Sequence, residues 1–183
     1  MPGSRRDGLE NGRTLNCMEQ ALVTRNVLLM LSTKQPPHPL TEVRFHAAES
    51  AARGSTWLVT TRISTGLEPG RSVVALYGDV ALGNRLLGSG VFRSILPLHT
   101  RDGDRLLAAH PLYREAGIPQ GAAALLELTD VREAPAGAGL EWLDGIIEAT
   151  RRPLTLANLP RSAARGRVYY VARSPGGPAR RYG

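Results

Sequence analysis

The chain has 183 residues, of which 42% are hydrophobic, and a formal net charge of +7 at pH 7. This length and composition predict one ordinary domain with a buried core. Cys17 is the only cysteine, which excludes an intramolecular disulfide and a cysteine-rich zinc site and is typical of a reducing compartment. No apolar run reaches the ~18 residues of a membrane span, and the first residues lack the apolar segment of a signal peptide. We therefore expect a cytoplasmic protein.

The N-terminal part of the chain contains one ambiguous element and one clear helix. Residues 1–15 show no apolar period and predict a flexible tail. Residues 17–31 suit a helix, whereas the continuous apolar run within 26–32 suits a strand, and periodicity alone leaves both open. After a proline-rich break, apolar residues at helical spacing predict a helix that Thr41 would cap and Gly54 would end.

Three successive strands form the strongest pattern in the sequence. They are predicted at 57–63, 73–77 and 86–96, where β-branched and aromatic residues are enriched and Gly, Pro, Asn and Asp fill the gaps. Gly88 and Gly90 lie within the third strand. Glycine at such positions favours a bulge or a bend.

The second half of the chain mixes helices and strands. Residues 99–104 are polar and predict a loop, and 111–116 predict a short helix that begins with proline. Apolar residues within 123–134 predict a further strand, and helical spacing predicts a helix over 140–152. A last strand is expected at 168–172.

The C-terminal segment, residues 151–183, is strongly basic. It contains eight arginines and no acidic residue, so the rest of the chain is close to neutral. Such a segment favours a polyanionic partner, because arginines neutralise phosphates. We expect residues 174–183 to be a disordered basic tail and residues 16–173 to form a single α+β domain.

Two local patterns suggest other chemistry. Arg85–Gly90 has the Arg-x-x-Gly-x-Gly spacing of acetyltransferases of the GNAT type, in which backbone amides hold coenzyme A, but strand-forming residues follow it here. His99, Asp102, Asp104 and His110 cluster in sequence without the spacing of a known metal site. We predict a surface loop there, no metal and no cofactor, and we assign no catalytic residue.

The features from Trp57 to Val131 resemble, in their order, the PUA-like group of small β-barrels, especially its EVE and ASCH members. A strand that carries a tryptophan leads to the Pro69-Gly70 turn, and the strand 73–77 follows. A glycine-containing strand at 87–92 and an apolar strand at 125–131 complete the match. The resemblance implies a small, mostly antiparallel β-barrel with flanking helices and a pocket that reads a modified or flipped base in RNA or DNA. Trp57 and Tyr77 would line that pocket.

The sequence therefore predicts a nucleic-acid-binding module whose arginines supply affinity and whose pocket supplies selectivity. The alternatives are an acyltransferase-like enzyme that uses a coenzyme A loop, and a structural or assembly protein whose basic tail docks on a protein partner. No membrane partner is expected. The candidate nucleic-acid-binding residues are Trp57, Arg62, Arg71, Tyr77, Arg151, Arg152, Arg161, Arg165, Arg167, Arg173, Arg180 and Arg181.

Overall fold

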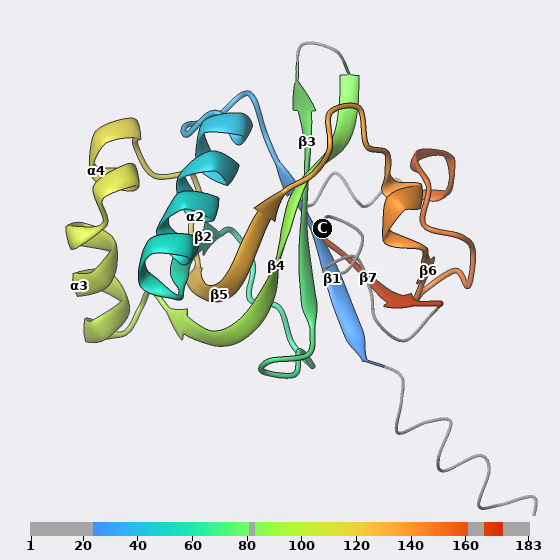
Figure 1. Ribbon diagram of the computed structural model, residues 1–183. Coiled ribbons are helices and arrows are strands. Elements are labelled where there is room, and N and C mark those ends of the chain that lie inside the picture. The colour runs from blue at the N-terminus through green and yellow to red at the C-terminus, as the bar shows by residue number, and fades with distance from the viewer. Residues whose placement is uncertain (1–23, 81–82, 161–166, 174–183) are drawn as a thin grey trace, which may run out of the picture.

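The computed structural model describes residues 24–80, 83–160 and 167–173. The tails predicted at 1–15 and 174–183 lie outside these residues. The sequence-based expectation of an α+β class is confirmed: within the described ranges, a seven-stranded mixed sheet is accompanied by three α-helices (Figure 1). In chain order the elements are β1 (Arg25–Leu31), α2 (Pro39–Arg53), β2 (Thr56–Thr60), β3 (Val73–Val80), β4 (Gly83–Pro97), α3 (Arg101–Ala109), α4 (Pro111–Ala116), β5 (Ala124–Glu133), η1 (Leu140–Leu143), β6 (Gly145–Ile147), η2 (Leu156–Asn158) and β7 (Arg167–Ala172).

The sheet is open and strongly curved. Its strand order is β2-β5-β4-β3-β1-β7-β6, so β2 and β6 are edges and the strands do not close into a barrel. Three strands separate β2 from β1, yet Leu58 of β2 belongs to the same buried cluster as Val27 and Leu29 of β1. Irregular pairing at Leu76/Tyr77 and within β4 supplies the bends. The curvature therefore brings the concave sides of β1 and β2 toward one another.

The ambiguous first element is a strand, and the helix predicted over 17–31 is wrong where the structure describes it. β1 pairs in parallel with β3 on one side and antiparallel with β7 on the other. A strand buried between two neighbours reads as a continuous apolar run, which is why its periodicity could not separate it from a helix. The other sheet pairings are antiparallel.

Helix α2 begins at Pro39, two residues before Thr41, so the predicted cap at Thr41 is wrong. Its N-cap is His38, whose Nδ1 accepts the Leu40 N–H at 3.3 Å. The predicted end is confirmed, because Gly54 adopts a left-handed conformation with φ 84°.

The loop predicted at 99–104 is wrong, because α3 begins there. Thr100 is its N-cap, and the Thr100 Oγ1 accepts the Gly103 N–H at 3.2 Å. Asp102 and Asp104 lie in the first turn, where negative side chains favour the helix dipole. The acidic pair of the predicted loop thus belongs to the start of a helix.

The helix predicted over 140–152 is also wrong. Residues 140–143 form a single 3₁₀ turn that ends at Asp144, whose φ is 45°. Gly145 then begins β6, which pairs with β7. A Cβ atom at Gly145 would lie 2.6 Å from the Tyr170 ring, so this close approach requires glycine.

Helices α2, α3 and α4 lie on one side of the molecule, and η1 with β6 lies on the other (Figure 1). Leu107, Leu112 and Tyr113 of α3 and α4 pack on Val59 and Leu125 of the sheet. The opposite cluster joins the η1 segment to the strands through residues Leu28, Tyr77, Leu140, Leu143, Ile147 and Tyr170. Within the described ranges, no helix has the length and apolar character needed to cross a membrane.

Candidate functional site

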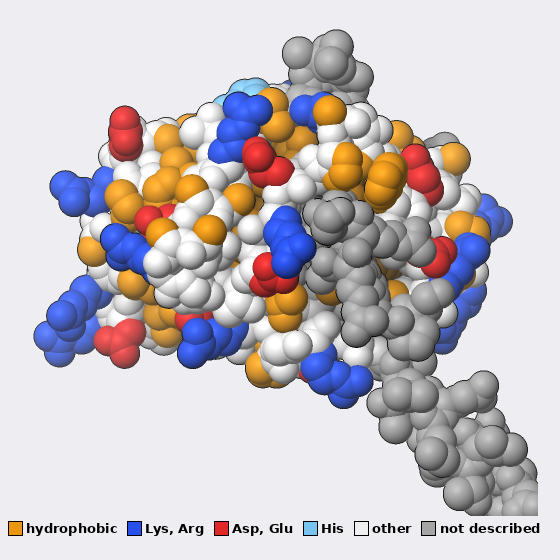
Figure 2. Space-filling view, in the orientation of Figure 1, with side chains coloured by type: hydrophobic (Ala, Val, Ile, Leu, Met, Phe, Trp, Pro, Cys, Tyr) orange, Lys and Arg blue, Asp and Glu red, His pale blue; other side chains and the backbone are white. Residues whose placement is uncertain are grey.

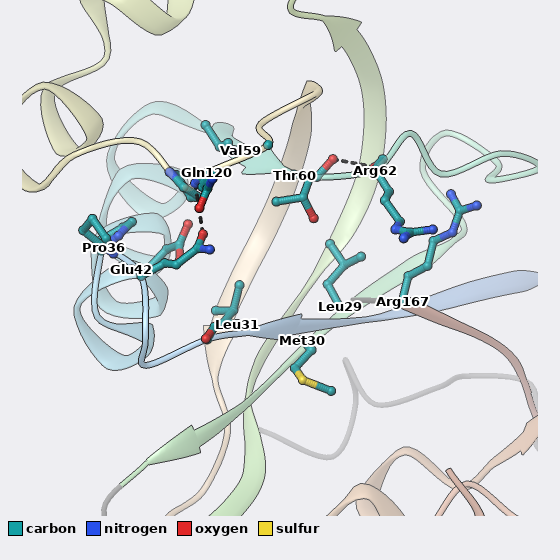
Figure 3. Close-up of a pocket in the computed structure, with 16 residues that line it drawn as sticks. Leu29, Met30, Leu31, Pro36, Glu42, Val59, Thr60, Arg62, Gln120 and Arg167 are labelled. Atoms are coloured by element: carbon teal, nitrogen blue, oxygen red, sulfur yellow. Dashed lines mark hydrogen bonds between the residues drawn. The ribbon is translucent and has the colours of Figure 1, made fainter. Parts of the chain in front are cut away.

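A cavity of about 560 Å³ lies between the C-terminal ends of β1 and β2. It occupies the gap that the curvature leaves between these strands, and a turn at 119–121 forms another part of its wall (Figure 3). Its volume falls within the range of about 300–1,000 Å³ that is usual for small-molecule sites. The lining residues are Leu29, Met30, Leu31, Ser32, Gln35, Pro36, Pro37, Glu42, Val59, Thr60, Thr61, Arg62, Pro119, Gln120, Gly121 and Arg167.

The middle of the cavity is apolar. Alternation along β1 directs Leu29 and Leu31 toward the cavity, whereas the Met30 side chain points to the other side of the strand (Figure 3). Val59 of β2 borders the cavity too, but its side chain packs in the cluster of α3 and α4 on the other side of the strand. Leu29 and Leu31 therefore provide the aliphatic surface, which is suited to a flat or apolar ligand.

One end of the cavity is cationic. Arg62, just beyond β2, and Arg167, the first residue of β7, extend toward one another there (Figure 3). Arg167 donates to the Ile63 carbonyl, and the Thr60 hydroxyl donates to the Arg62 carbonyl at 2.6 Å. Among the described residues, neither guanidinium forms an ion pair with a carboxylate. Two neighbouring cations without an acidic partner make this end suitable for an anion.

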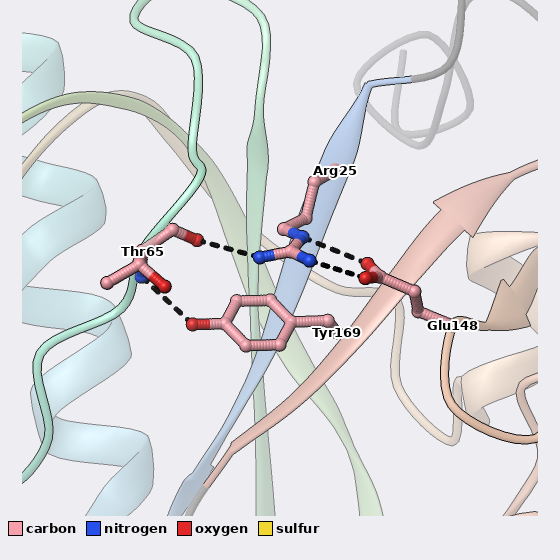
Figure 4. A network of polar contacts seen from close by, with 4 residues as sticks. All are labelled: Arg25, Thr65, Glu148 and Tyr169. Carbon is pink, nitrogen blue, oxygen red and sulfur yellow. Dashed lines mark hydrogen bonds and ion pairs between the residues drawn. The ribbon is translucent and has the colours of Figure 1, made fainter. Parts of the chain in front are cut away.

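A network behind Arg62 fixes the loop that carries it (Figure 4). The Tyr169 hydroxyl accepts the Thr65 N–H at 2.9 Å, and Arg25 donates to the Thr65 carbonyl at 3.3 Å. Arg25 also pairs with both oxygens of Glu148, and its guanidinium lies 4.5 Å from the centre of the Tyr169 ring. The loop from β2 is thereby attached to β7, so Arg62 and Arg167 are held on a common support.

The other end of the cavity holds a buried carboxyl group. Glu42 of α2 is only 3% exposed, and its Oε1 accepts the Tyr113 O–H at 2.7 Å. The Tyr113 oxygen in turn accepts the Val59 N–H at 2.9 Å and lies 3.2 Å from His46 Nε2. Because the Tyr113 hydroxyl donates its hydrogen to Glu42, it can only accept from His46, so His46 Nε2 carries the hydrogen of that contact. The other ring nitrogen, Nδ1, then accepts the Thr56 hydroxyl, 2.7 Å away. The chain of contacts connects the cavity to the helices behind β2.

Burial controls the charge of this chain of groups. Burial raises the pKa of Glu42 to about 7, while the hydrogen bond from Tyr113 opposes that rise. Burial, with a smaller effect from His110, lowers the pKa of His46 to about 3, so His46 is neutral at physiological pH. Burial also raises the pKa of Tyr113 well above its usual value. Glu42 is thus the member of this chain that changes charge near neutral pH.

The two aromatic residues predicted to line a pocket lie elsewhere. Trp57 is partly buried and packs with the cluster formed by α3 and α4. Tyr77 is 2% exposed and lies in the cluster on the opposite side of the sheet. Neither contributes to the wall of the cavity.

The predicted arginines are dispersed. Of these, Arg62 and Arg167 meet at the cavity, while Arg71 pairs with Glu68 at 2.9 Å and Arg173 lies 4.0 Å from Asp144. Residues 151 and 152 are exposed arginines outside the cavity wall. The remaining four candidates lie outside the described residues: Arg161, Arg165, Arg180 and Arg181.

The two alternative motifs adopt ordinary secondary structure. Arg85–Gly90 lies within β4, paired with β3 and β5, and no helix begins after it. The predicted irregularity at the glycines is confirmed, since pairing with β5 shifts between Ser89 and Val91. A Cβ atom at Gly88 would lie 2.6 Å from the Arg132 carbonyl oxygen. Across the described part of the chain, no group of three or more His, Cys, Asp or Glu residues could hold a metal ion.

Sequence reasoning missed the carboxyl end of the cavity. Its signal is a polar stripe on α2, where Glu42, His46 and Ser50 follow one another at four-residue spacing beside the apolar stripe. All three are buried. Polar side chains that continue a buried face at helical spacing indicate an internal hydrogen-bond network, and in this chain the network reaches a cavity.

On the face drawn in Figure 2, the basic side chains of the described residues do not gather into one patch. Basic side chains are spread over this face, and acidic side chains lie between them. Several exposed arginines of the described chain are paired with acidic side chains, including Arg44 with Glu133 at 3.1 Å and Arg132 with Asp130 at 3.0 Å. Exposed pairs of this kind contribute little stability and leave less charge for a ligand.

Comparison with family models, with curated proteins and with solved structures finds no match to this chain. The roles of the residues therefore rest on their geometry and chemistry.

Proposed function

We propose that the protein is a nucleic-acid-binding module of the PUA-like kind, in which the cavity between β1 and β2 receives one base and the arginine pair holds a phosphate. The observation that carries the proposal is the meeting of Arg62 and Arg167 at one end of a cavity whose middle is apolar, without a carboxylate partner among the described residues. Arginine binds phosphate oxygens through its planar array of N–H donors.

The shape of the sheet supports this proposal. A PUA-like barrel would close where β2 approaches β1, and the curved sheet brings these strands to the two sides of one cavity. The gap leaves room for a ligand whose flat face contacts Leu29 and Leu31. A base extruded from its stack meets the same requirements of flatness, apolar faces and polar edges.

The charge distribution supports the same partner. The excess of arginine in residues 151–183 attracts a polyanion without regard to sequence, and Arg167 connects that segment to the cavity. Affinity would come from many phosphate contacts, and selectivity from the few groups within the cavity.

Binding of RNA and DNA oligonucleotides measured over a series of salt concentrations tests the proposal. Affinity should fall as salt rises, because phosphate binding releases counterions. The absence of binding at low salt, or binding that does not change with salt, would refute it.

A further inference from the structure

The cavity between β1 and β2 contains a buried carboxyl group as well as its cationic end. Figure 3 shows Glu42 at one end and Arg62 and Arg167 at the other. Glu42 is only 3% exposed, and Tyr113 is its one hydrogen-bond donor among the described residues. An ionised Glu42 is therefore a buried charge with little compensation, and the cost of that charge depends on what else the cavity contains.

The two ends of the cavity are close enough for their charges to interact. A sphere with the volume of the cavity, about 560 Å³, is roughly 10 Å across, which is about one Debye length at 0.1 M salt and well below it at 0.01 M. Leu29 and Leu31 lie between the two ends, and their aliphatic surface keeps the effective dielectric constant below that of water. An anion bound by the arginines therefore opposes ionisation of the Glu42 carboxyl.

A coupling of this kind is reciprocal. If a bound anion makes Glu42 harder to ionise, an ionised Glu42 must weaken the binding of the anion by the same factor. We propose that the cavity is a proton-linked anion site, in which an anion on Arg62 and Arg167 binds together with a proton on Glu42 and is released as this carboxyl ionises. The inference rests on the proposed function, because it uses the same phosphate site, and it adds regulation of that site by pH.

The titration of Glu42 places this linkage near neutral pH. Burial raises the pKa of Glu42 to about 7, so in the empty cavity the carboxyl is mainly protonated at pH 6 and mainly ionised at pH 8. An anion that raises this pKa further binds more tightly at the lower pH. The repulsion between two charges roughly 10 Å apart predicts binding about two- to fivefold tighter at pH 6 than at pH 8.

The groups in the hydrogen-bond chain of Glu42 keep one charge state over this interval. Burial raises the pKa of Tyr113 well above its usual value, so Tyr113 stays protonated. Burial lowers the pKa of His46 to about 3, and it also lowers the pKa of His110, whose ring adjoins those of His46 and Tyr113. The strand β2, which packs beside α2, has no titratable side chain.

The other charged groups around α2 lie at its outer end or are paired. His38, the N-cap of α2, is exposed and can gain a proton near pH 6. On β5, which packs along α2, Glu127, Asp130 and Glu133 each lie within ion-pair distance of an arginine. A Glu42→Gln variant retains all of these groups, so its comparison with the wild type isolates the contribution of Glu42.

The experiment uses inorganic sulfate and phenyl sulfate, two anions that keep their charge between pH 6 and pH 8 and donate no hydrogen bond. Calorimetry at low ionic strength gives their dissociation constants at both pH values for the wild type and for Glu42→Gln. The wild type should bind both anions about two- to fivefold more tightly at pH 6, beyond any change that the variant shows. Glu115→Gln, at an exposed position on α4, should behave as the wild type does.

A second measurement needs no replacement of Glu42. The ¹³C resonance of the Glu42 carboxyl follows its titration directly, and the midpoint should rise by about 0.5–1 pH unit when sulfate saturates the cavity. Arg62→Gln should weaken sulfate binding, because it removes one of the two cations that hold the anion.

Equal pH dependence in the wild type and Glu42→Gln, or a Glu42 titration that saturating sulfate leaves unchanged, would overturn the proton linkage. If Arg62→Gln still weakened sulfate binding in that case, the phosphate site and the proposed function would stand. Failure of both anions to bind at either pH would refute the phosphate site and the linkage together.

Discussion

Replacement of Glu42 by Gln tests the electrostatics of the cavity through stability. Gln keeps the size of the side chain and can still accept the Tyr113 O–H, but it cannot ionise. In the wild type, the pKa of Glu42 is raised to about 7 from its ordinary value of 4.5. Between pH 4.5 and pH 7, Glu42 therefore stays protonated in the folded state, whereas it is ionised in the unfolded chain.

The sign of the effect follows from that difference in bound protons. The stabilising contribution of protonated Glu42 is fully present below pH 4.5 and is lost as pH rises toward and beyond 7, because the carboxylate is then buried with one hydrogen-bond donor. This difference between the folded and unfolded pKa of Glu42 corresponds to about 3 kcal/mol of unfolding free energy, at about 1.4 kcal/mol for each pKa unit.

Urea denaturation of both proteins at pH 5 and pH 8 provides the measurement. The free energy of unfolding of Glu42→Gln, relative to wild type, should improve by about 3 kcal/mol between pH 5 and pH 8. His46 and His110 contribute to the pH dependence of both proteins, so their effects cancel in this comparison. Glu115→Gln should follow the wild type. Parallel pH profiles for wild type and Glu42→Gln would refute a buried carboxyl that titrates near neutral pH.

Two further predictions concern the groups that support the cavity. Tyr113→Phe removes the hydroxyl that bonds to Glu42, Val59 and His46. The free energy of unfolding, measured by urea denaturation, should therefore fall by about 2–4 kcal/mol. A loss below about 0.5 kcal/mol would contradict this network. Tyr169→Phe removes the acceptor of the Thr65 N–H. Hydrogen exchange at the Thr65 amide should therefore accelerate markedly, while exchange in β3 is unchanged. Equal exchange rates at Thr65 in the variant and the wild type would contradict the anchoring of the loop.

The strands were the most predictable part of the fold. Alternation and turn residues located β2 to β5 and β7 to within a few residues, because local pattern largely determines such elements. Pattern could not decide β1, since its identity as a strand depends on burial between β3 and β7. The order of strands depends on contacts distant in sequence, so the approach of β1 to β2 could not be read from the chain.

The site was predictable only at its cationic end. Arg62 and Arg167 were among the predicted binding residues, but their meeting depends on a loop fixed by Arg25 and Tyr169. Glu42 was missed because a charged residue on a helix is usually exposed. Its burial becomes understandable only when Tyr113, 71 residues later in the chain, is placed against it.

The salt dependence of binding by a double variant tests the central claim most directly. Arg62→Gln with Arg167→Gln removes the cavity pair, and Arg105→Gln with Arg114→Gln removes the same charge from exposed positions on α3 and α4. If the cavity pair holds phosphate, a plot of log affinity against log salt for a single-stranded oligonucleotide should lose about 1.4 from its slope in the cavity variant, about 0.7 for each contact. The control variant should retain nearly the wild-type slope. Equal changes in the two variants would contradict a phosphate site at the cavity.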